Sequence, residues 1–264
     1  MKWKIFYIEI LLNRWKMSKK VIAVIPARYG STRFPGKPLA KINHKEMILW
    51  VAEAVRKSDL VSEIIIATDH QGIYDLVTKN HFTAVMTDPN LPSGTDRMWA
   101  AIRKESFDIA VNVQGDEPLL KHAHLELLIK SLIEDSECEM STLAQPLVMS
   151  AGTNELENLN SVKVIVNQKN HAIYFSRFAI PYSRVEHSKG SQLAYKHIGL
   201  YAYKKEFLER FCSTPVCELE KAESLEQLRA LYLGAKIKVV KVSDAGWGVD
   251  TPEDLIKIDK LLNS

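Results

Sequence analysis

The sequence predicts an α/β fold in which a mostly parallel sheet is flanked by helices and extended by a small antiparallel lobe. Up to residue 134, short β-branched apolar runs alternate with longer helical patterns, as in βαβ units. From Met140 to Tyr203, extended runs follow one another without an intervening helix, which favours antiparallel strands. The 264 residues are 46% apolar and 25% charged, the balance of a soluble globular domain with a sizeable core.

The elements follow from these patterns in chain order. Short apolar runs predict parallel strands at residues 21–25, 63–67, 83–86 and 109–113. Apolar residues spaced three or four apart predict helices at 47–57, 73–80, 96–105 and 122–134. Extended runs predict strands at 142–148, 162–166 and 194–203, followed by a helix at 223–233 and a strand at 236–242. A last helix is expected after Thr251, because Thr251, Pro252 and Asp254 supply a cap, a first-turn proline and a capping-box acid.

Residues 1–16 differ from the rest of the chain. They combine a basic start with an apolar run, but Glu9 interrupts the run, which is too short to span a bilayer and lacks a small-residue cleavage site. We therefore expect a non-core extension and no stable membrane insertion, with membrane contact as the less favoured alternative. Residues 17–264 contain no low-complexity linker or solenoid repeat, so a single domain is predicted.

Charge and cysteine content exclude several classes of protein. A net charge of +3 is too small for a surface that coats a polyanion, so nucleic acid is not an expected partner. Cys138, Cys212 and Cys217 form no C-x-x-C pair and no even set, so neither a zinc site nor a disulfide framework is indicated. A reducing cytoplasm fits this pattern.

A basic loop follows the first strand. It holds Arg28, Arg33 and Lys37 together with Gly30 and Gly36, and ligands of α/β sheets bind at the carboxyl ends of strands. Three cations and free backbone N–H groups match the charge of a triphosphate, which is spread over several oxygens. The loop is neither a Walker A motif nor G-x-G-x-x-G. A solvated surface loop is the alternative, because exposed basic residues are common.

Two aspartates are candidate metal ligands. Asp116 lies just past the fourth parallel strand, where Asp beside Gly and Pro also suits a simple turn. Asp250 precedes the last helix but is not needed as its cap, since Thr251 takes that role. Mg²⁺ binds one or two carboxylates together with phosphate and water oxygens, so this pair suits a metal that bridges nucleotide phosphates.

Seven sequence blocks occur together and in one order. They are PARYGSTRFPGKPL at 26–39, SGTDR at 93–97, VNVQGDEP at 111–118, YFSR at 174–177, KHIGLYAY at 196–203, LEQLR at 225–229 and GVDTPEDL at 248–255. In these blocks the chain resembles the 3-deoxy-manno-octulosonate cytidylyltransferases, also called CMP-KDO synthetases. The resemblance covers nearly everything from Lys19 onward and implies a nucleotide-diphospho-sugar transferase fold, a dimerisation lobe and a homodimer.

The resemblance also implies an activity and a set of site residues. The activity is transfer of CMP from CTP to the eight-carbon acid sugar KDO, with release of pyrophosphate, for lipopolysaccharide inner-core synthesis in the cytoplasm. The implied nucleotide-binding residues are Arg28, Arg33, Lys37, Ser93, Arg97 and Gln114. The implied sugar-binding residues are Arg177, His197, Tyr201, Glu226 and Gln227. The implied catalytic residues are Arg28, Arg33, Lys37, Asp116 and Asp250, the last two of which would hold Mg²⁺.

Structural alternatives remain for two of these positions, since Glu226 suits a solvated helix face and Tyr201 suits a core strand. Alternatives also remain for the substrate: 8-amino-KDO or a sialic acid could replace KDO. A glycosyltransferase is disfavoured because Asp116-Glu-Pro is not a D-x-D motif, and a catalytically dead binding subunit is disfavoured because the basic loop and both aspartates are present.

Overall fold

The computed structural model describes residues 19–30, 34–150, 153–182, 184, 193–244, 246 and 248–262. The extension expected at residues 1–16 and the candidate ligand Arg33 lie outside these ranges. In the described part of the chain, no helix is long and apolar enough to cross a membrane.

The described residues form one large mixed sheet with nine strands. These are β1 (Val21–Ala27), β4 (Glu63–Thr68), β5 (Thr83–Met86), β6 (Ile109–Asn112), β7 (Met140–Pro146), β10 (Lys163–Val166), β11 (Ala172–Ser176), β12 (Tyr195–Lys204) and β13 (Ile237–Lys241). Strands β5, β4, β1 and β6 are parallel. Strand β12 runs antiparallel to β6 and pairs with both β10 and β7, so the sheet forks there. This confirms a mostly parallel core with an antiparallel addition.

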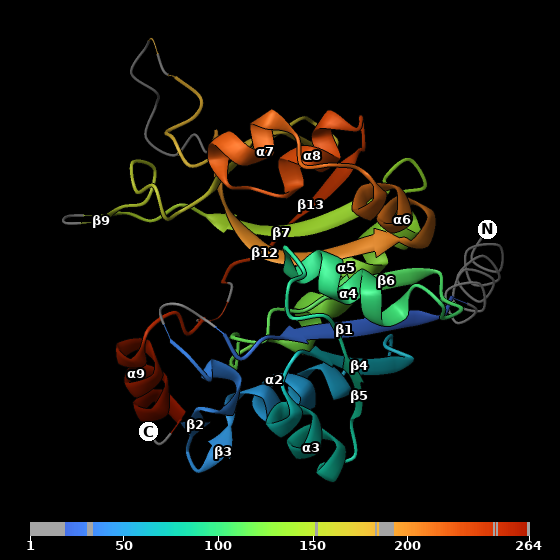
Figure 1. Cartoon of the computed structure of the whole chain (residues 1–264). Coiled ribbons are helices and arrows are strands. Elements are labelled where there is room, and N and C mark those ends of the chain that lie inside the picture. The colour runs from blue at the N-terminus through green and yellow to red at the C-terminus, as the bar shows by residue number, and fades with distance from the viewer. Residues whose placement is uncertain are drawn as a thin grey trace, which may run out of the picture.

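Helices cover both faces of this sheet (Figure 1). They are α2 (Met47–Arg56), α3 (Gln71–Lys79), α4 (Gly94–Ile102), α5 (His122–Glu134), α6 (Lys205–Ser213), α7 (Glu218–Glu223), α8 (Gln227–Tyr232) and α9 (Pro252–Leu262). Alternate residues of β1 face opposite ways. Ala23 and Ile25 pack with α2, α3 and α5 in one core cluster. Ile22 and Val24 pack with α4, α6 and α8 in the other. The sequence shows these strands as continuous apolar runs because both faces are buried.

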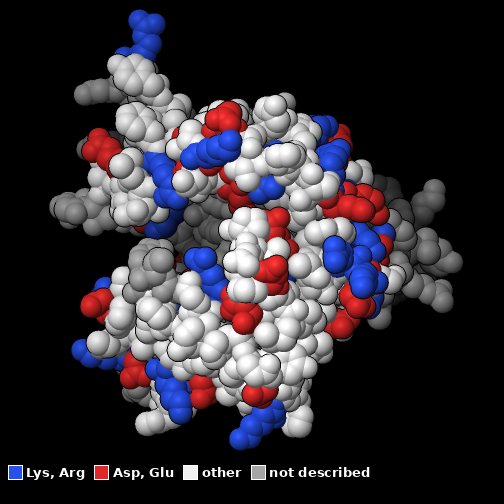
Figure 2. All heavy atoms as spheres, viewed as in Figure 1, with Lys and Arg blue, Asp and Glu red and all other residues white. Residues whose placement is uncertain are grey.

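The strand order creates a place for a ligand. The chain proceeds from β1 outward to β4 and β5, then returns to place β6 on the other side of β1. Loops at the carboxyl ends of β1 and β6 therefore diverge, and ligands of open α/β sheets bind at such a switch point. Figure 2 shows a hollow between the part that carries α7 and α8 and the part that carries α2 and α9, with charged side chains at its rim.

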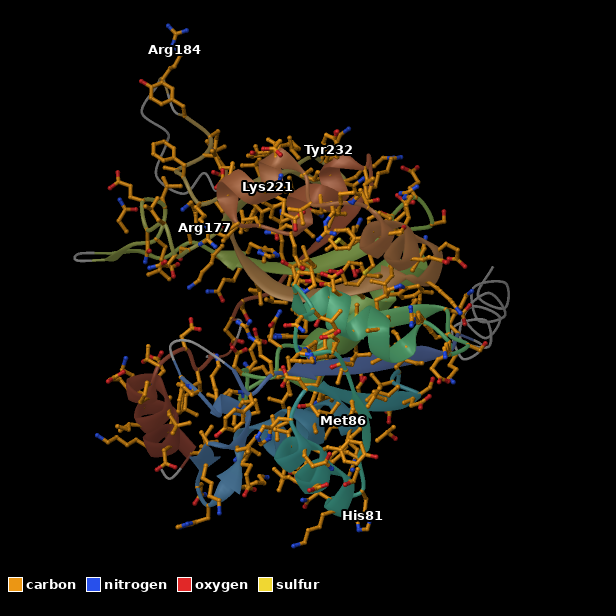
Figure 3. All side chains as sticks on the ribbon, viewed as in Figure 1. His81, Met86, Arg177, Arg184, Lys221 and Tyr232 are labelled. Carbon is orange, nitrogen blue, oxygen red and sulfur yellow. The ribbon has the colours of Figure 1, made fainter. Side chains whose placement is uncertain are left out.

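Short hairpins complete the fold. Strands β2 (Lys41–Ile42) and β3 (Lys45–Glu46) pair beside α9, and β8 (Met149–Ser150) pairs with β9 (Thr153–Asn154). The β8–β9 and β10–β11 hairpins belong to the small antiparallel lobe. In Figure 3, Arg177 lies near α7, whereas Arg184 lies well away from the body of the molecule.

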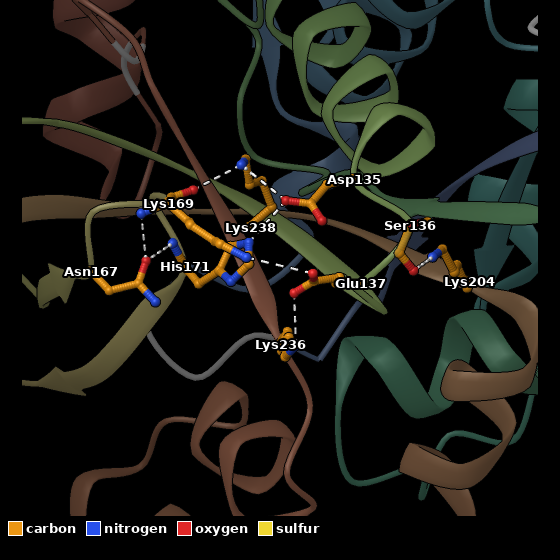
Figure 4. A network of polar contacts seen from close by, with 9 residues as sticks. All are labelled: Asp135, Ser136, Glu137, Asn167, Lys169, His171, Lys204, Lys236 and Lys238. Carbon is orange, nitrogen blue, oxygen red and sulfur yellow. Dashed lines mark hydrogen bonds and ion pairs between the residues drawn. The ribbon is translucent and has the colours of Figure 1, made fainter.

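A polar cluster fastens the β10–β11 turn to the end of α5 (Figure 4). The Asp135 carboxylate accepts hydrogen bonds from His171 Nε2 at 2.8 Å and Lys238 Nζ at 3.0 Å. Burial alone would raise the pKa of Asp135, but these bonds hold it below its usual range. Cys138 lies in the same cluster, where burial raises its thiol pKa to about 12. Because the carboxylate already has two partners, we assign the cluster a structural role.

The structure corrects one predicted helix and adds elements that the pattern did not reveal. The single helix predicted at 223–233 is wrong. Helix α7 ends at Glu223, Ser224 takes a left-handed conformation with φ 51°, and α8 begins at Gln227. Helix α6 and strand β11 were not predicted. Helix α6 has only a narrow apolar stripe, Phe207, Leu208 and Phe211, which tertiary packing buries.

Candidate active site

A cavity of about 310 Å³ lies at the carboxyl ends of β1 and β6. Three chain segments supply most of its wall: the loop after β1, the N-terminus of α4 and the loop after β6. Its lining residues are Pro26, Ala27, Arg28, Lys37, Pro38, Leu91, Pro92, Ser93, Gly94, Arg97, Gln114, Gly115, Asp116 and Asp250. The cavity therefore gathers every described residue that the sequence assigned to the nucleotide or the metal.

The basic loop after β1 is closed by Tyr29 and Gly36. The Gly36 N–H donates to Tyr29 O at 2.9 Å, and Gly36 has φ 70°, a conformation that favours glycine. Arg28 is exposed at the cavity wall, and no hydrogen bond or ion pair to another described residue holds its guanidinium. Lys37 begins the short 3-10 helix η1 (Lys37–Leu39). Its side chain is only 14% exposed, so its ammonium is aimed into the site.

Asp116 and Asp250 converge on the Lys37 ammonium. Lys37 Nζ lies 2.5 Å from Asp116 Oδ2 and 3.9 Å from Asp250 Oδ1, and it donates to Val249 O at 2.9 Å. The two carboxylates come from residues 134 positions apart, yet one cation contacts both. The sequence predicted this pair, and the structure brings the two side chains to one end of the cavity.

Backbone contacts explain how Asp250 reaches Asp116. The Val249 N–H donates to Asp116 O at 2.8 Å, which ties the segment before α9 to the loop after β6. Gly246 has φ 75°, and a Cβ there would lie 3.0 Å from Leu119 O, so close backbone approach requires glycine. Gly115 is similar, because a Cβ would lie 3.0 Å from Pro26 O.

Glu117 adds no full negative charge to this corner of the site. Burial, reinforced by the Asp116 carboxylate, raises the pKa of Glu117 to about 8. The side chain is therefore mostly protonated at neutral pH. No sequence pattern indicates a role for Glu117, although it stands next to Asp116.

The N-terminus of α4 forms a second wall. Ser93 caps the helix by accepting from the Asp96 N–H at 3.1 Å. Arg97, one turn further, is 3% exposed and donates to Thr87 Oγ1 at 2.5 Å and to Asp69 Oδ2 at 3.0 Å. The structure thus pairs Arg97 with a carboxylate, that of Asp69, which is 11% exposed and which the sequence patterns did not indicate.

A second group of predicted residues lies where β6 meets β12. Gln114 Nε2 donates to Gly199 O at 3.0 Å, which links the cavity to β12. The Tyr201 hydroxyl donates to Gln227 Oε1 at 3.2 Å, and Thr142 Oγ1 lies 2.9 Å from His197 Nε2. The His197 and Tyr201 rings lie 5.5 Å apart. Three sugar-binding candidates, His197, Tyr201 and Gln227, are therefore linked by contacts, and Glu226 directly precedes Gln227 in the chain.

Burial sets the protonation of these groups. It lowers the pKa of His197 to about 3, so the ring is neutral at physiological pH. It raises the pKa of Tyr201, with the Glu226 carboxylate adding to the effect. It also raises the pKa of Glu226, although the 2.7 Å hydrogen bond from Thr95 Oγ1 opposes part of this rise.

Two buried polar atoms in this region lack partners within the described part of the chain. They are Asn112 Oδ1 and Gln227 Nε2. Asn112 is buried and donates to Thr95 Oγ1 at 3.1 Å, and its neighbour across the strands is Tyr201. Buried polar groups are rarely left unpaired in proteins. Neither Asn112 nor Thr95 was among the predicted site residues, although both lie inside the blocks at 111–118 and 93–97.

Arg177 lies apart from the cavity lining. Its guanidinium donates to the carbonyls of Glu223 at 2.7 Å, Leu159 at 3.2 Å and Ser224 at 3.4 Å. Its backbone N–H donates to Glu223 Oε2 at 2.8 Å, and buried Lys163 donates to its carbonyl. The side chain therefore covers the carboxyl end of α7, and its role toward a sugar stays a prediction.

Comparison with known proteins identifies the family. The cytidylyltransferase family model matches residues 22–237. A 3-deoxy-manno-octulosonate cytidylyltransferase from Bdellovibrio bacteriovorus is 50% identical over 247 residues, which cover 93% of this chain and 98% of the relative. One from Thermodesulfovibrio yellowstonii is 42% identical, with coverage of 92% and 98%.

The solved structures agree. A CMP:2-keto-3-deoxy-manno-octonic acid synthetase in complex with CTP superposes with a TM-score of 0.86 at 38% identity, covering 92% of this chain and 98% of its own. A 4-diphosphocytidyl-2C-methyl-D-erythritol synthase from Anaerococcus prevotii, 14% identical with a TM-score of 0.61, shares the fold over 93% of this chain and 99% of its own. The chain therefore belongs to the cytidylyltransferase family, within the group of the 3-deoxy-manno-octulosonate cytidylyltransferases.

Proposed function

We propose that the chain transfers CMP from CTP to KDO and releases pyrophosphate. The observation that carries the proposal is the convergence of Arg28, Lys37, Asp116 and Asp250 in one cavity at the carboxyl edge of the sheet. The related structure at 38% identity was solved with CTP, which supports CTP as the nucleotide substrate. The product of this reaction is an activated acid sugar for lipopolysaccharide synthesis. We propose that this activation takes place in the cytoplasm.

The basic side chains suit the triphosphate. Arg28 and Lys37 line the cavity together with the N-terminal residues of α4, where the helix dipole favours an anion. Both cations can neutralise charge that develops on the departing pyrophosphate. Arg33, which lies in the same loop of the sequence, is assigned this role by resemblance.

The donor set suits Mg²⁺. Asp116 and Asp250 offer hard carboxylate oxygens that already face a common cation, the Lys37 ammonium. Once bound there, the metal would supply Lewis-acid stabilisation to the α-phosphate. The protein's own part is to hold both carboxylates in place, through the backbone bond from Val249 to Asp116.

The second group of residues suits an acid sugar rich in hydroxyls. Neutral His197, the Tyr201 hydroxyl, the Glu226 carboxyl and Gln227 Nε2, which has no hydrogen-bond partner among the described residues, offer both donors and acceptors. Arg177 is the candidate for the sugar carboxylate, because a guanidinium can bind it with two parallel hydrogen bonds. It would exchange the carbonyls it now contacts for the sugar.

In the proposed reaction, the anomeric hydroxyl attacks the α-phosphorus in line with the leaving pyrophosphate. Such a transfer requires mainly positioning and charge stabilisation, so no covalent enzyme intermediate is needed. Gln114 stands between the two groups of residues, because it lines the cavity and bonds to Gly199 of β12. We assign Gln114 the role of holding the nucleotide and the sugar in a fixed position relative to each other.

A pyrophosphate-release assay tests the proposal. Purified protein is given each nucleoside triphosphate in combination with KDO, 8-amino-KDO and a sialic acid. We expect the highest kcat/KM with CTP and KDO. A higher kcat/KM with 8-amino-KDO or sialic acid would overturn the assignment of the sugar, and a preference for another triphosphate would overturn that of the nucleotide.

We also propose that two copies assemble through the small lobe. Apolar side chains are exposed there, including Phe178 at 72%, Tyr182 at 88% and Leu159 at 59%. Exposed apolar groups gathered in one region mark interaction surfaces. A second copy is the expected partner, since two-fold dimers are the commonest protein assemblies.

A further inference from the structure

Asp69 connects two parts of the nucleotide cavity that are far apart in the sequence. It directly follows β4, whose last residue pairs with the last residue of β1. Its Oδ1 accepts from the Tyr29 N–H at 3.0 Å, and its Oδ2 accepts from Arg97 Nη2 at 3.0 Å. One carboxylate, 11% exposed, therefore holds both the basic loop and the buried arginine of α4.

The Arg97 guanidinium depends on this carboxylate for its position. With Arg97 only 3% exposed, an unpaired positive charge there would be costly. Its other described contact is Thr87 Oγ1, which in turn donates to Thr68 O at 3.0 Å. Asp69 and Thr87 thus accept hydrogen bonds from the two Nη atoms of Arg97 and fix the orientation of its guanidinium at the cavity wall.

The basic loop depends on the same carboxylate. The Tyr29 ring stacks on His70 with centroids 4.0 Å apart and planes 12° apart. Gly36 lies against the same ring, since a Cβ placed there would come within 3.3 Å of it. Asp69 therefore holds the backbone of Tyr29, and His70 holds its ring. Because Tyr29 also accepts from the Gly36 N–H, these two contacts position the two ends of the basic loop.

We propose that Asp69 is a positioning residue for CTP, which sets nucleotide affinity by coupling the basic loop to Arg97. This inference rests on the proposed function. The direction of the change in CTP affinity distinguishes positioning from a simple charge effect. A negative charge beside a triphosphate repels it, so removal of the Asp69 charge alone would strengthen CTP binding. If Asp69 acts by positioning, removal weakens CTP binding instead.

The test compares Asp69→Asn with Asp75→Asn. Asp75 lies six residues later on α3, is exposed, and accepts from Gln71 Nε2 at 2.8 Å. Loss of a hydrogen bond to a charged group predicts a KM for CTP about tenfold higher in Asp69→Asn, with the KM for KDO unchanged. Calorimetric titration of CTP alone should show the same loss. Asp75→Asn should match wild type in both measurements.

Two further variants keep the inference testable if Asp69→Asn does not fold. Thr87→Val removes the second hydrogen-bond acceptor of the Arg97 guanidinium without changing the charge. It should raise the KM for CTP but not that for KDO. Tyr29→Ala removes the stacked ring and should raise the KM for CTP more than Tyr29→Phe does.

The outcomes are distinct. Tighter or unchanged CTP binding in Asp69→Asn would overturn the inference. Equal rises in both Michaelis constants, together with a lower melting temperature, would show a general structural role and also overturn it. A wild-type protein that releases no pyrophosphate from CTP and KDO would instead refute the proposed function, while the calorimetric comparison would still decide the role of Asp69.

Discussion

Replacement of Lys37 by methionine is predicted to change catalysis and metal binding in opposite directions. In the free protein its ammonium contacts Asp116 at 2.5 Å and lies 3.9 Å from Asp250. If the same ammonium serves the triphosphate, its loss removes a charge-assisted hydrogen bond of about 1.5–3 kcal/mol. At about 1.4 kcal/mol per tenfold, kcat/KM for CTP should fall by roughly 10- to 100-fold.

The effect on the metal has the opposite sign. Lys37 is a cation that competes for the two carboxylates expected to bind Mg²⁺. A unit charge at about 4 Å is worth roughly 1 kcal/mol in water and about 4 kcal/mol at an effective dielectric constant of 20. Because the Asp250 side chain is 61% exposed and that of Asp116 31%, solvent screening favours the lower end. Removal of the ammonium should therefore tighten metal binding about tenfold in the absence of nucleotide.

Two assays decide the matter. Pyrophosphate release with CTP and KDO varied separately measures catalysis, and calorimetric titration with Mn²⁺ as a substitute for Mg²⁺ measures metal affinity. Lys41→Met is the matched control, since Lys41 is 62% exposed and lies 3.6 Å from Glu46, outside the cavity lining. Weaker Mn²⁺ binding in Lys37→Met, or unchanged kcat/KM, would refute the assignment of a shared site.

Four further predictions follow from the structure. Asp116→Asn and Asp250→Asn should each lower turnover by about two orders of magnitude, the scale of losing a preorganised electrostatic contact, and near-normal rates in the pyrophosphate assay would contradict the metal assignment. Arg177→Ala should raise the KM for KDO and leave that for CTP unchanged, and Arg177→Lys should not rescue it because a point charge cannot form the bidentate contact; a rise confined to CTP would count against the division of the site. Asp135→Asn should lower the free energy of unfolding at neutral pH. Because the folded-state pKa of Asp135 is depressed, the difference in this free energy between wild type and variant should shrink as the pH falls below the unfolded carboxyl pKa of about 4. Denaturant unfolding at several pH values measures this difference, and a difference that grows toward acid pH would contradict the prediction. Phe178→Asp should convert the expected dimer to a monomer in light scattering at micromolar concentration, whereas a wild-type monomer would rule out the assembly.

The parallel core and the nucleotide side of the cavity were predictable because their signals are local. A continuous apolar run followed by a basic glycine loop identifies β1 and its ligand edge within about twenty residues. Asp116 could be placed in the same way, since it directly follows β6. The convergence of Asp116 with Asp250 was predicted by the family resemblance, which implies that the two aspartates hold one metal.

Contacts between distant segments were decided by the tertiary structure alone. The partnership of Asp69 with Tyr29 and Arg97 spans 40 and 28 positions, and nothing in the sequence around any of the three residues indicates the other two. The same holds for Arg177, whose guanidinium covers carbonyls of α7 that lie 46 positions later. Sequence patterns report which face of an element is buried, but not which polar side chains then meet across the core.

Secondary structure follows the same division. Helix α5 was predicted with its observed bounds because its apolar residues recur at helical spacing over thirteen positions. The break at Ser224 was not predicted, because apolar spacing continues through Leu225 and Leu228, and only packing reveals that the backbone turns there. By itself the sequence determined the fold class, the edge of the sheet that binds ligand and the chemistry gathered there, since each depends on short-range patterns. Tertiary structure decided which charges are paired and which remain available, because that depends on segments brought together only by folding.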